Sequence, residues 1–233
     1  MASGKELTLI ETGMGKTGAA EAFRWTMGVG RPDLIVSMGF AGSLCDDFDV
    51  GRVILGNRFL YLPSSPVSWR HAVLRMEIPP GLEAYCRGGG IEIAQVVTAD
   101  RPESKAETSR RFAEAPSVMD MESYILCRCS HEEGIPFLSL RAVSDGVDDE
   151  IDFDVDAISD SAGTIRISKV ISATIAKPRL IRSFLASWQR SRRAAEQLAG
   201  ALANLLSVRE NDLRDMVPAI GFRQEESDER RGP

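Results

Sequence analysis

The amino-acid sequence predicts an α/β domain, and three observations carry this prediction. Residues 137–143 (F-L-S-L-R-A-V) form a short, mostly apolar run between a proline and a glycine, which is typical of a strand buried on both faces. Two turns rich in small residues, G-M-G-K-T-G and G-F-A-G-S, each follow an apolar run. Asp120 and Glu122 lie where another short strand gives way to a helix. With 233 residues, the chain is long enough for one such domain with a sizeable core.

The first elements surround the glycine-rich turn at residues 13–18. Residues 6–11 (E-L-T-L-I-E) alternate and predict a strand, and the turn opens a helix over residues 16–27. The turn fails the Walker pattern, because Ile10 stands where that pattern requires a glycine. It satisfies the dinucleotide fingerprint, but the next strand ends in Gly39-Phe40 and offers no acidic partner for a ribose. A dinucleotide site therefore stays an alternative to glycines that allow close helix–sheet packing.

The remaining elements are read from the same patterns. Strands are predicted at residues 33–38, 50–62, 91–98 and 137–143, and helices at residues 82–87 and 103–113, between Glu122 and Gly134, and at residues 177–208. Residues 64–80 predict a loop, as does the acidic segment 148–160, which lacks the glycine and ligand spacing of an EF-hand.

The last helix and the residues after it set the domain boundary. Apolar residues recur at helical spacing within residues 177–208, which favours packing in the core or in a dimer. The arginines of this helix leave contact with a membrane surface as an alternative. Residues 209–233 are charged and poor in apolar side chains, so we predict a single domain over residues 1–208 and a disordered tail.

Composition excludes several classes of protein. The formal net charge of -6 argues against nucleic acid as a partner. No apolar run approaches the roughly 18 residues of a membrane-spanning helix, and the N-terminal residues lack the apolar core of a signal peptide. The four cysteines form no C-x-x-C pair, and the two histidines complete no metal-ligand spacing. We therefore expect a cytoplasmic, reduced protein that holds no metal.

Glu122 and Asp145 are the candidate functional residues. Taken singly, an acidic residue at a helix start is commonly a cap, and Asp-Gly after a strand is commonly a turn. Here both carboxylates are predicted at the carboxyl ends of strands, the edge at which open α/β sheets bind ligands. Together with the two small-residue turns, they favour a binding or catalytic site.

Four segments in this order and spacing resemble the nucleoside phosphorylase family, which includes the methylthioadenosine/S-adenosylhomocysteine nucleosidases. They are G-M-G-K-T-G-A-A, M-G-F-A-G-S-L with D-V-G-R-V-I-L, V-M-D-M-E-S and R-A-V-S-D-G, and they span residues 6–146. The long C-terminal helix is similar to that of the hopanoid-biosynthesis phosphorylases, which act on adenosylhopane. The resemblance implies three αβα layers around a mixed, twisted sheet, a homodimer, and no cofactor.

The activity that this resemblance implies is cleavage of the N-ribosidic bond of a purine nucleoside of the adenosyl type. Loss of the purine leaves positive charge on the sugar and negative charge on the base. Asp145 corresponds to the general acid that protonates the purine near N7, and must hold a proton to do so. Glu122 corresponds to the residue that binds the ribose hydroxyls and stabilises the cationic sugar. The other implied substrate-binding residues are Met121 against the sugar, Ser144 beside Asp145, and Gly15, Phe40, Ala41 and Gly42 in the two turns.

The chain departs from the family at its phosphate site. Phosphorylases of this family typically carry an arginine where this sequence has Ser37, and some carry a serine where it has Phe40. Without a local arginine, phosphate binding loses its usual bidentate partner, which favours hydrolysis over phosphorolysis. Phosphorolysis stays the alternative, because Lys16 or Arg101 could supply the charge.

A second departure concerns the residue that activates water. Family members begin with a strand that precedes the segment matched by residues 6–11 and brings an early glutamate. We expect this chain to lack that strand, because it starts too late to contain it. Loss of a general base typically lowers a rate by about two to four orders of magnitude. A non-catalytic protein that binds adenine or a nucleoside is therefore the rival interpretation.

Overall fold

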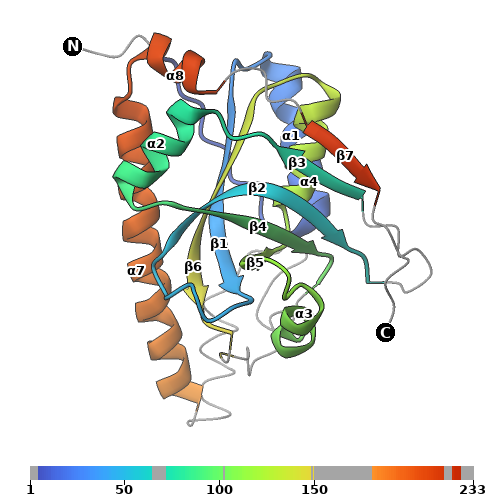
Figure 1. Ribbon diagram of the computed structural model, residues 1–233, viewed down its shortest axis with the longest axis vertical. Helices are drawn as coiled ribbons and strands as arrows, with labels where there is room; N and C mark the ends of the chain where they lie inside the picture. The colour runs from blue at the N-terminus through green and yellow to red at the C-terminus, as the bar shows by residue number, and fades with distance from the viewer. Residues whose placement is uncertain are drawn as a thin grey trace.

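The computed structural model of the chain describes residues 5–64, 72–101, 103–147, 149, 180–217 and 222–226. A mixed sheet lies between the long helix α7 on one side and the helices α1 and α4 on the other (Figure 1), as the sequence predicts. The helices are α1 (Gly15–Val29), α2 (Pro80–Gly89), α3 (Lys105–Arg111), α4 (Ser123–Glu132), α7 (Leu180–Ser207) and α8 (Glu210–Met216). The strands are β1 (Ile35–Ser43), β2 (Val53–Leu62), β3 (Ala72–Met76), β4 (Glu92–Ala99), β5 (Ser117–Asp120), β6 (Phe137–Asp145) and β7 (Phe222–Glu226).

Five of these strands close on themselves. The strand order is β4-β5-β1-β6-β2-β3-β7, and β4 pairs with β2 as well, so that β2, β4, β5, β1 and β6 form a ring. Strands β1 and β6 run parallel, and β5 is antiparallel to β1. Strands β3 and β7 extend the sheet beyond β2. The end of β1 is thus enclosed by β5 on one side and β6 on the other.

Strand β1 continues through the segment that the sequence predicts as a second turn. It extends to Ser43 and pairs with β6 as far as Gly42. A Cβ atom on Gly39 would lie 3.1 Å from a terminal nitrogen of Arg141, which crosses β1 at this point. Glycine inside a strand often marks such a close approach. The small residues of G-F-A-G-S therefore accommodate neighbouring side chains and do not reverse the chain.

The predicted strand at residues 6–11 is wrong. Among the strands that the structure describes, none pairs with residues 5–13, and Leu7 and Leu9 are 63% and 87% exposed. Alternation produces a strand only where a neighbouring strand supplies hydrogen bonds. The segment is held at its start, where the ammonium group of Lys5 donates to two carbonyl oxygens at the end of α7.

Two other regions differ from the prediction. Residues 64–80, predicted as a loop, contain β3, which the pattern misses because residues 73, 74 and 76 are all buried and do not alternate. The predicted disordered tail is wrong for residues 210–216 and 222–226, which form α8 and β7. The pairing of β7 with β3 supplies the hydrogen bonds that its charged sequence does not suggest. The acidic segment 148–160 lies outside the described residues, except for Asp149.

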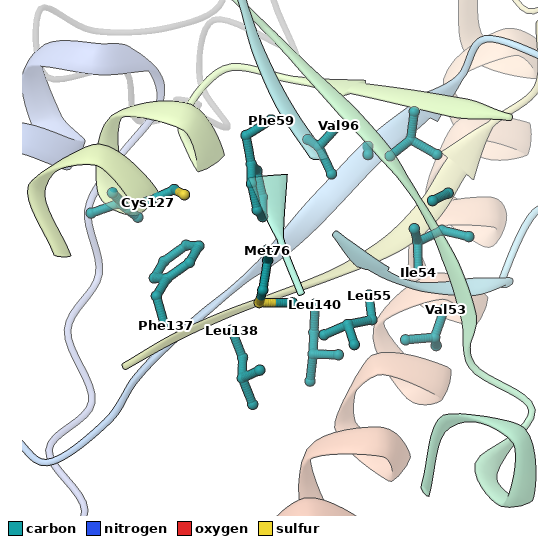
Figure 2. Close-up of a cluster of buried hydrophobic side chains, with 14 of the residues drawn as sticks. Val53, Ile54, Leu55, Phe59, Met76, Val96, Cys127, Phe137, Leu138 and Leu140 are labelled. Carbon is teal, nitrogen blue, oxygen red and sulfur yellow. The ribbon is translucent and has the colours of Figure 1, made fainter. Parts of the chain in front are cut away.

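The core gathers apolar side chains from both faces of the ring. Figure 2 shows Phe137 and Leu140 of β6 pointing to opposite sides of the strand, with Phe137 directed toward Phe59, whose ring centre lies 5.8 Å from its own. On the opposite side, four buried residues of α7 pack on the sheet, namely Ala194, Leu198, Ala201 and Leu205. This confirms core packing for that part of the last helix. No helix in the described part of the chain combines the length and apolar character needed to cross a bilayer.

Candidate active site

Glu122 is held by the glycine-rich turn at the start of α1. Its Oε1 atom accepts a hydrogen bond of 2.6 Å from the backbone N–H of Gly15. Gly15 has a φ of +85°, which residues with a side chain rarely adopt, and Met121 lies 4.0 Å from where its Cβ would be. The Glu122 carboxylate thus occupies the N-terminus of α1. This argues against the dinucleotide alternative, in which a pyrophosphate would take that place.

A buried ion pair fixes the segment that carries Glu122. The Arg141 Nε atom lies 2.6 Å from Asp120 Oδ2, and the two side chains are 2% and 0% exposed. Asp120 also accepts a hydrogen bond of 2.6 Å from Thr98 and one of 3.2 Å from the backbone N–H of Ser123. Asp120 therefore anchors the first turn of α4. The sequence patterns single out Asp120 but not Arg141, which is a charged residue inside an otherwise mostly apolar strand.

The residues considered for phosphate are engaged elsewhere. Ser37, at the position of the family's arginine, is buried and accepts a hydrogen bond of 2.9 Å from Arg141. The Lys16 ammonium lies 2.8 Å from Asp100 and 3.1 Å from the hydroxyl oxygen of Tyr61. Arg101 pairs with Glu103 at 3.2 Å.

Replacing Arg141 tests the buried pair. We expect Arg141→Met to lower the free energy of unfolding by about 3–5 kcal/mol, because Asp120 is left as a buried charge without its partner. Arg128→Met is the matched control, since Arg128 pairs with Glu132 on the surface, where such pairs contribute about 0–1 kcal/mol. Urea unfolding of both variants measures the difference. Similar losses in the two variants would contradict a supporting role for Arg141.

The environment of Glu122 favours its neutral form. Burial first, and the charge of Asp120 second, raise the pKa of Glu122 above its ordinary value. The N–H of Gly15 and the charge of Arg141 act in the opposite direction and offset part of this effect. Ionisation of this carboxyl group therefore comes at a cost in stability.

Asp145 ends β6 beside a bulge. The register between β1 and β6 shifts between Ala41 and Gly42, so that Gly42 pairs with Asp145 and Ser144 is left over. Such bulges often turn a side chain toward a functional site. The Ser144 hydroxyl donates to Asp145 Oδ1, and its oxygen lies 3.4 Å from the carbonyl oxygen of Ala41. The structure therefore brings together four of the predicted residues.

Lys105 is a second residue that the sequence patterns did not single out. It is 5% exposed, and its Nζ atom donates to Asp145 Oδ2, to the carbonyl oxygen of Gly146 at 2.7 Å and to that of Asp149 at 2.8 Å. Within the predicted helix 103–113, nothing in the sequence distinguishes Lys105 from the other polar residues. An ammonium group in contact with a carboxylate stabilises its ionised form, whereas the family resemblance implies a protonated acid.

The two carboxylates are connected through the end of β1. Gly42 pairs with Met119 of β5 on one side and with Asp145 of β6 on the other. From the sequence, we expected Glu122 and Asp145 at the shared carboxyl edge of parallel strands. They do not share such an edge, because β5 is antiparallel to β1 whereas β6 is parallel to it. Phe40, 45% exposed, precedes this junction on β1.

A cavity of about 460 Å³ lies elsewhere, on β2, β3, β4 and the segment before β5. It is lined by Asn57, Arg58, Arg75, Ile93, Ala94, Gln95, Ala115 and Pro116, none of which is a predicted site residue. In the described part of the chain, no three histidine, cysteine, aspartate or glutamate residues are placed to hold a metal ion.

Comparison with known proteins identifies the family of the chain. The family described as the phosphorylase superfamily matches residues 1–176. The 5'-methylthioadenosine/S-adenosylhomocysteine nucleosidase of Listeria monocytogenes serotype 4a (strain HCC23) is 27% identical over 177 residues, which are 65% of this chain and 75% of the relative. The enzyme of the same name from Haemophilus influenzae (strain PittEE) is 25% identical over 167 residues, 63% of this chain and 71% of the relative.

Solved structures show the same fold. The 5'-methylthioadenosine/S-adenosylhomocysteine nucleosidase of Neisseria meningitidis, in complex with methylthio-immucillin-A, superposes with a TM-score of 0.60 at 22% identity, over 87% of this chain and 81% of the other. The Streptococcus pneumoniae MTA/SAH nucleosidase in complex with 8-aminoadenine gives a TM-score of 0.51 at 19% identity, over 60% and 67%. The predicted family and fold are confirmed, and the chain belongs to the phosphorylase superfamily.

Proposed function

We propose that this protein hydrolyses the N-ribosidic bond of a purine nucleoside of the 5′-substituted adenosine type. The observation that carries the proposal is the placement of two fixed carboxylates around the end of β1. Glu122 is held by the N–H of Gly15, and Asp145 is held by Ser144 and Lys105. The relatives are named 5'-methylthioadenosine/S-adenosylhomocysteine nucleosidases, and this name supports the substrate class.

Each carboxylate has one task in this reaction. As the C1′–N9 bond breaks, the ionised Glu122 binds the ribose hydroxyls and stabilises the positive charge that develops on the sugar. Asp145 delivers a proton to N7, so that the purine leaves as a neutral molecule. Met121 packs against the sugar, and the backbone of Ala41 and Gly42 approaches it closely.

Water is the proposed acceptor of the ribosyl group. The cations considered for phosphate, Lys16 and Arg101, pair with Asp100 and Glu103, and Ser37 is buried against Arg141. These contacts support hydrolysis over phosphorolysis.

We also propose that the protein acts in the cytoplasm as a homodimer. The four cysteines are free thiols, which suits a reducing compartment.

Product analysis tests the proposal. The protein is incubated with adenosine, methylthioadenosine, S-adenosylhomocysteine and an adenosine with a bulky apolar 5′ group, with and without phosphate. We expect free adenine and a free ribosyl sugar at a rate that phosphate does not change. A sugar 1-phosphate would show phosphorolysis instead. If no nucleoside is consumed but adenine raises the Tm, the protein is a binding protein.

Gly42→Ala tests whether the reaction takes place beside Asp145. A Cβ atom at this position would lie 2.8 Å from Asp145 Oδ2 and 2.9 Å from Lys105 Cε, so the pair must move. We expect kcat/KM to fall by about 10²-fold, the usual effect of displacing a catalytic group by about 1 Å. Gly28→Ala, where nothing lies within 4 Å of the added atom, is the control and should keep full activity. Normal turnover by the Gly42 variant would place the chemistry elsewhere.

A further inference from the structure

The contact between Lys105 and Asp145 raises a question that the proposed function does not answer. A general acid must hand over a proton, yet Asp145 is paired with an ammonium ion, which favours the ionised carboxylate. The ammonium group of Lys105 is therefore the proton donor in direct contact with Asp145. A mechanism for the site has to bring a proton from there to the base.

Lys105 occupies a place that is unfavourable for a lysine. It is nearly fully buried, and removing an ammonium group from water is costly unless it is fully hydrogen-bonded. It is also the first residue of α3, where the helix dipole disfavours positive charge. An apolar side chain of similar length could fill the space without these costs. Local conflicts of this kind are typical of functional sites.

The three acceptors around Nζ match its three N–H groups. Two are backbone carbonyl oxygens, of Gly146 and Asp149, and cannot take up a proton at neutral pH. The third is the Asp145 carboxylate, the only one of the three that can accept a proton. Gly42, opposite, adds no side chain and leaves room for the pair against β1. The geometry thus directs a proton from Nζ to a single atom, Asp145 Oδ2.

The charged residue that contacts Lys105 besides Asp145 in the described part of the chain is Asp149. The Asp149 carboxylate accepts a hydrogen bond of 2.9 Å from the N–H of Gly146 and lies 3.2 Å from Arg190 of α7, so its charge is compensated. Strand β1 faces the pair with Gly42, and β6 contributes the neutral hydroxyl of Ser144. The pair is therefore neutral as a unit, whichever partner carries the proton.

We propose that Lys105 is a positioning residue that supplies, through Asp145, the proton given to the leaving purine. This inference rests on the proposed function. The Nζ–H bond breaks and a proton passes to Asp145 Oδ2, which leaves a neutral amine and a neutral carboxylic acid. The acid then gives its proton to N7 while the C1′–N9 bond breaks and its electron pair passes to the purine. Water adds to C1′ and releases a proton to the solvent, from which the amine is protonated again.

The pair gives the enzyme a broader working range of pH than a lone carboxylic acid. An isolated aspartic acid has lost nearly all of its proton at neutral pH, whereas a lysine retains it into the alkaline range. The rate on the alkaline side therefore follows protonation of the pair and not that of an ordinary carboxyl group. A lysine that only braced the loop would leave the shape of the pH profile unchanged.

The experiment compares kcat/KM from acid to alkaline pH in the wild type, Lys105→Met and Lys105→Arg. In the methionine variant, we expect the alkaline loss of activity to begin at least about one pH unit lower, because Asp145 alone must hold the proton. In the arginine variant, which keeps the charge but does not release a proton, we expect kcat to fall by about 10²–10⁴-fold. Lys5→Met is the matched control, since Lys5 also binds two carbonyl oxygens, and should leave the profile unchanged.

The outcomes separate this inference from the proposed function. If the wild type releases no base from any nucleoside, the proposed function is wrong and the inference falls with it. If the wild type is active, an unchanged profile in Lys105→Met overturns the inference alone. Should the methionine variant fail to fold, the arginine variant decides, because wild-type activity in it would show that charge alone is sufficient.

Discussion

Glu122→Gln is expected to lower kcat by about 10²–10⁴-fold while leaving adenine binding nearly unchanged. Glutamine keeps the size of the side chain, and its carbonyl oxygen can still accept the hydrogen bond from the N–H of Gly15. What it loses is the negative charge that faces the sugar as the ribosyl cation develops. Because that charge develops only in the transition state, the loss should appear in kcat more than in the affinity for adenine. Steady-state kinetics with adenine as a competitive ligand measure both quantities.

The same substitution should stabilise the protein at neutral pH. Burial raises the pKa of Glu122 in the folded state above its value in the unfolded chain. Folding therefore favours the protonated form, and the stability that this provides is lost as the pH rises through the folded-state pKa. Each unit by which the pKa is raised costs about 1.4 kcal/mol at neutral pH, and a neutral glutamine removes this cost. We expect a higher Tm for the variant at pH 7 and a smaller difference at roughly pH 4.

The pH dependence of kcat/KM in the wild type should also report the raised pKa of Glu122. Because Glu122 has to be ionised to stabilise the sugar cation, its raised pKa should make kcat/KM fall on the acid side at a higher pH than for an ordinary glutamate. Glu132→Gln, at the exposed end of α4, is the control and should keep both the rate and the profile. A Glu122→Gln variant with wild-type activity and unchanged stability would show that Glu122 is not part of the active site.

The sequence allowed prediction of those parts of the candidate site that are local to one strand end. Glu122 and Asp145 could be placed because each directly follows a short apolar run and lies in a segment typical of the family. Their partners could not be placed in the same way. Lys105 is 40 residues from Asp145 along the chain, and Arg141 is 21 residues from Asp120. Contacts of this kind depend on how the strands are ordered, which no local pattern reveals.

The errors in the fold have a related cause. Residues 6–11 alternate as a strand should, but no described strand pairs with them, whereas the charged residues 222–226 form a strand because β3 pairs with them. In both segments, the available partner decides the structure over the intrinsic preference of the residues. The G-F-A-G-S segment was read as a turn for a similar reason. Its glycines leave room for side chains of β6 and α3 that pack against them. Those side chains lie far away in the sequence, so the segment alone does not reveal why it needs glycine.

Asp145→Asn is expected to lower kcat by about 10²–10⁴-fold with little change in KM. The asparagine amide retains the shape of the side chain and can hydrogen-bond to N7, but it has no proton to transfer, so the purine must leave as an anion. Substrates whose bases leave more easily should be affected least, and an adenosine analogue with a base of lower N9–H pKa provides that comparison. Asp47→Asn, an exposed carboxylate shortly after β1, is the control. Equal losses for good and poor leaving groups would show that Asp145 binds the base without protonating it, and then Lys105 would have no proton to pass on.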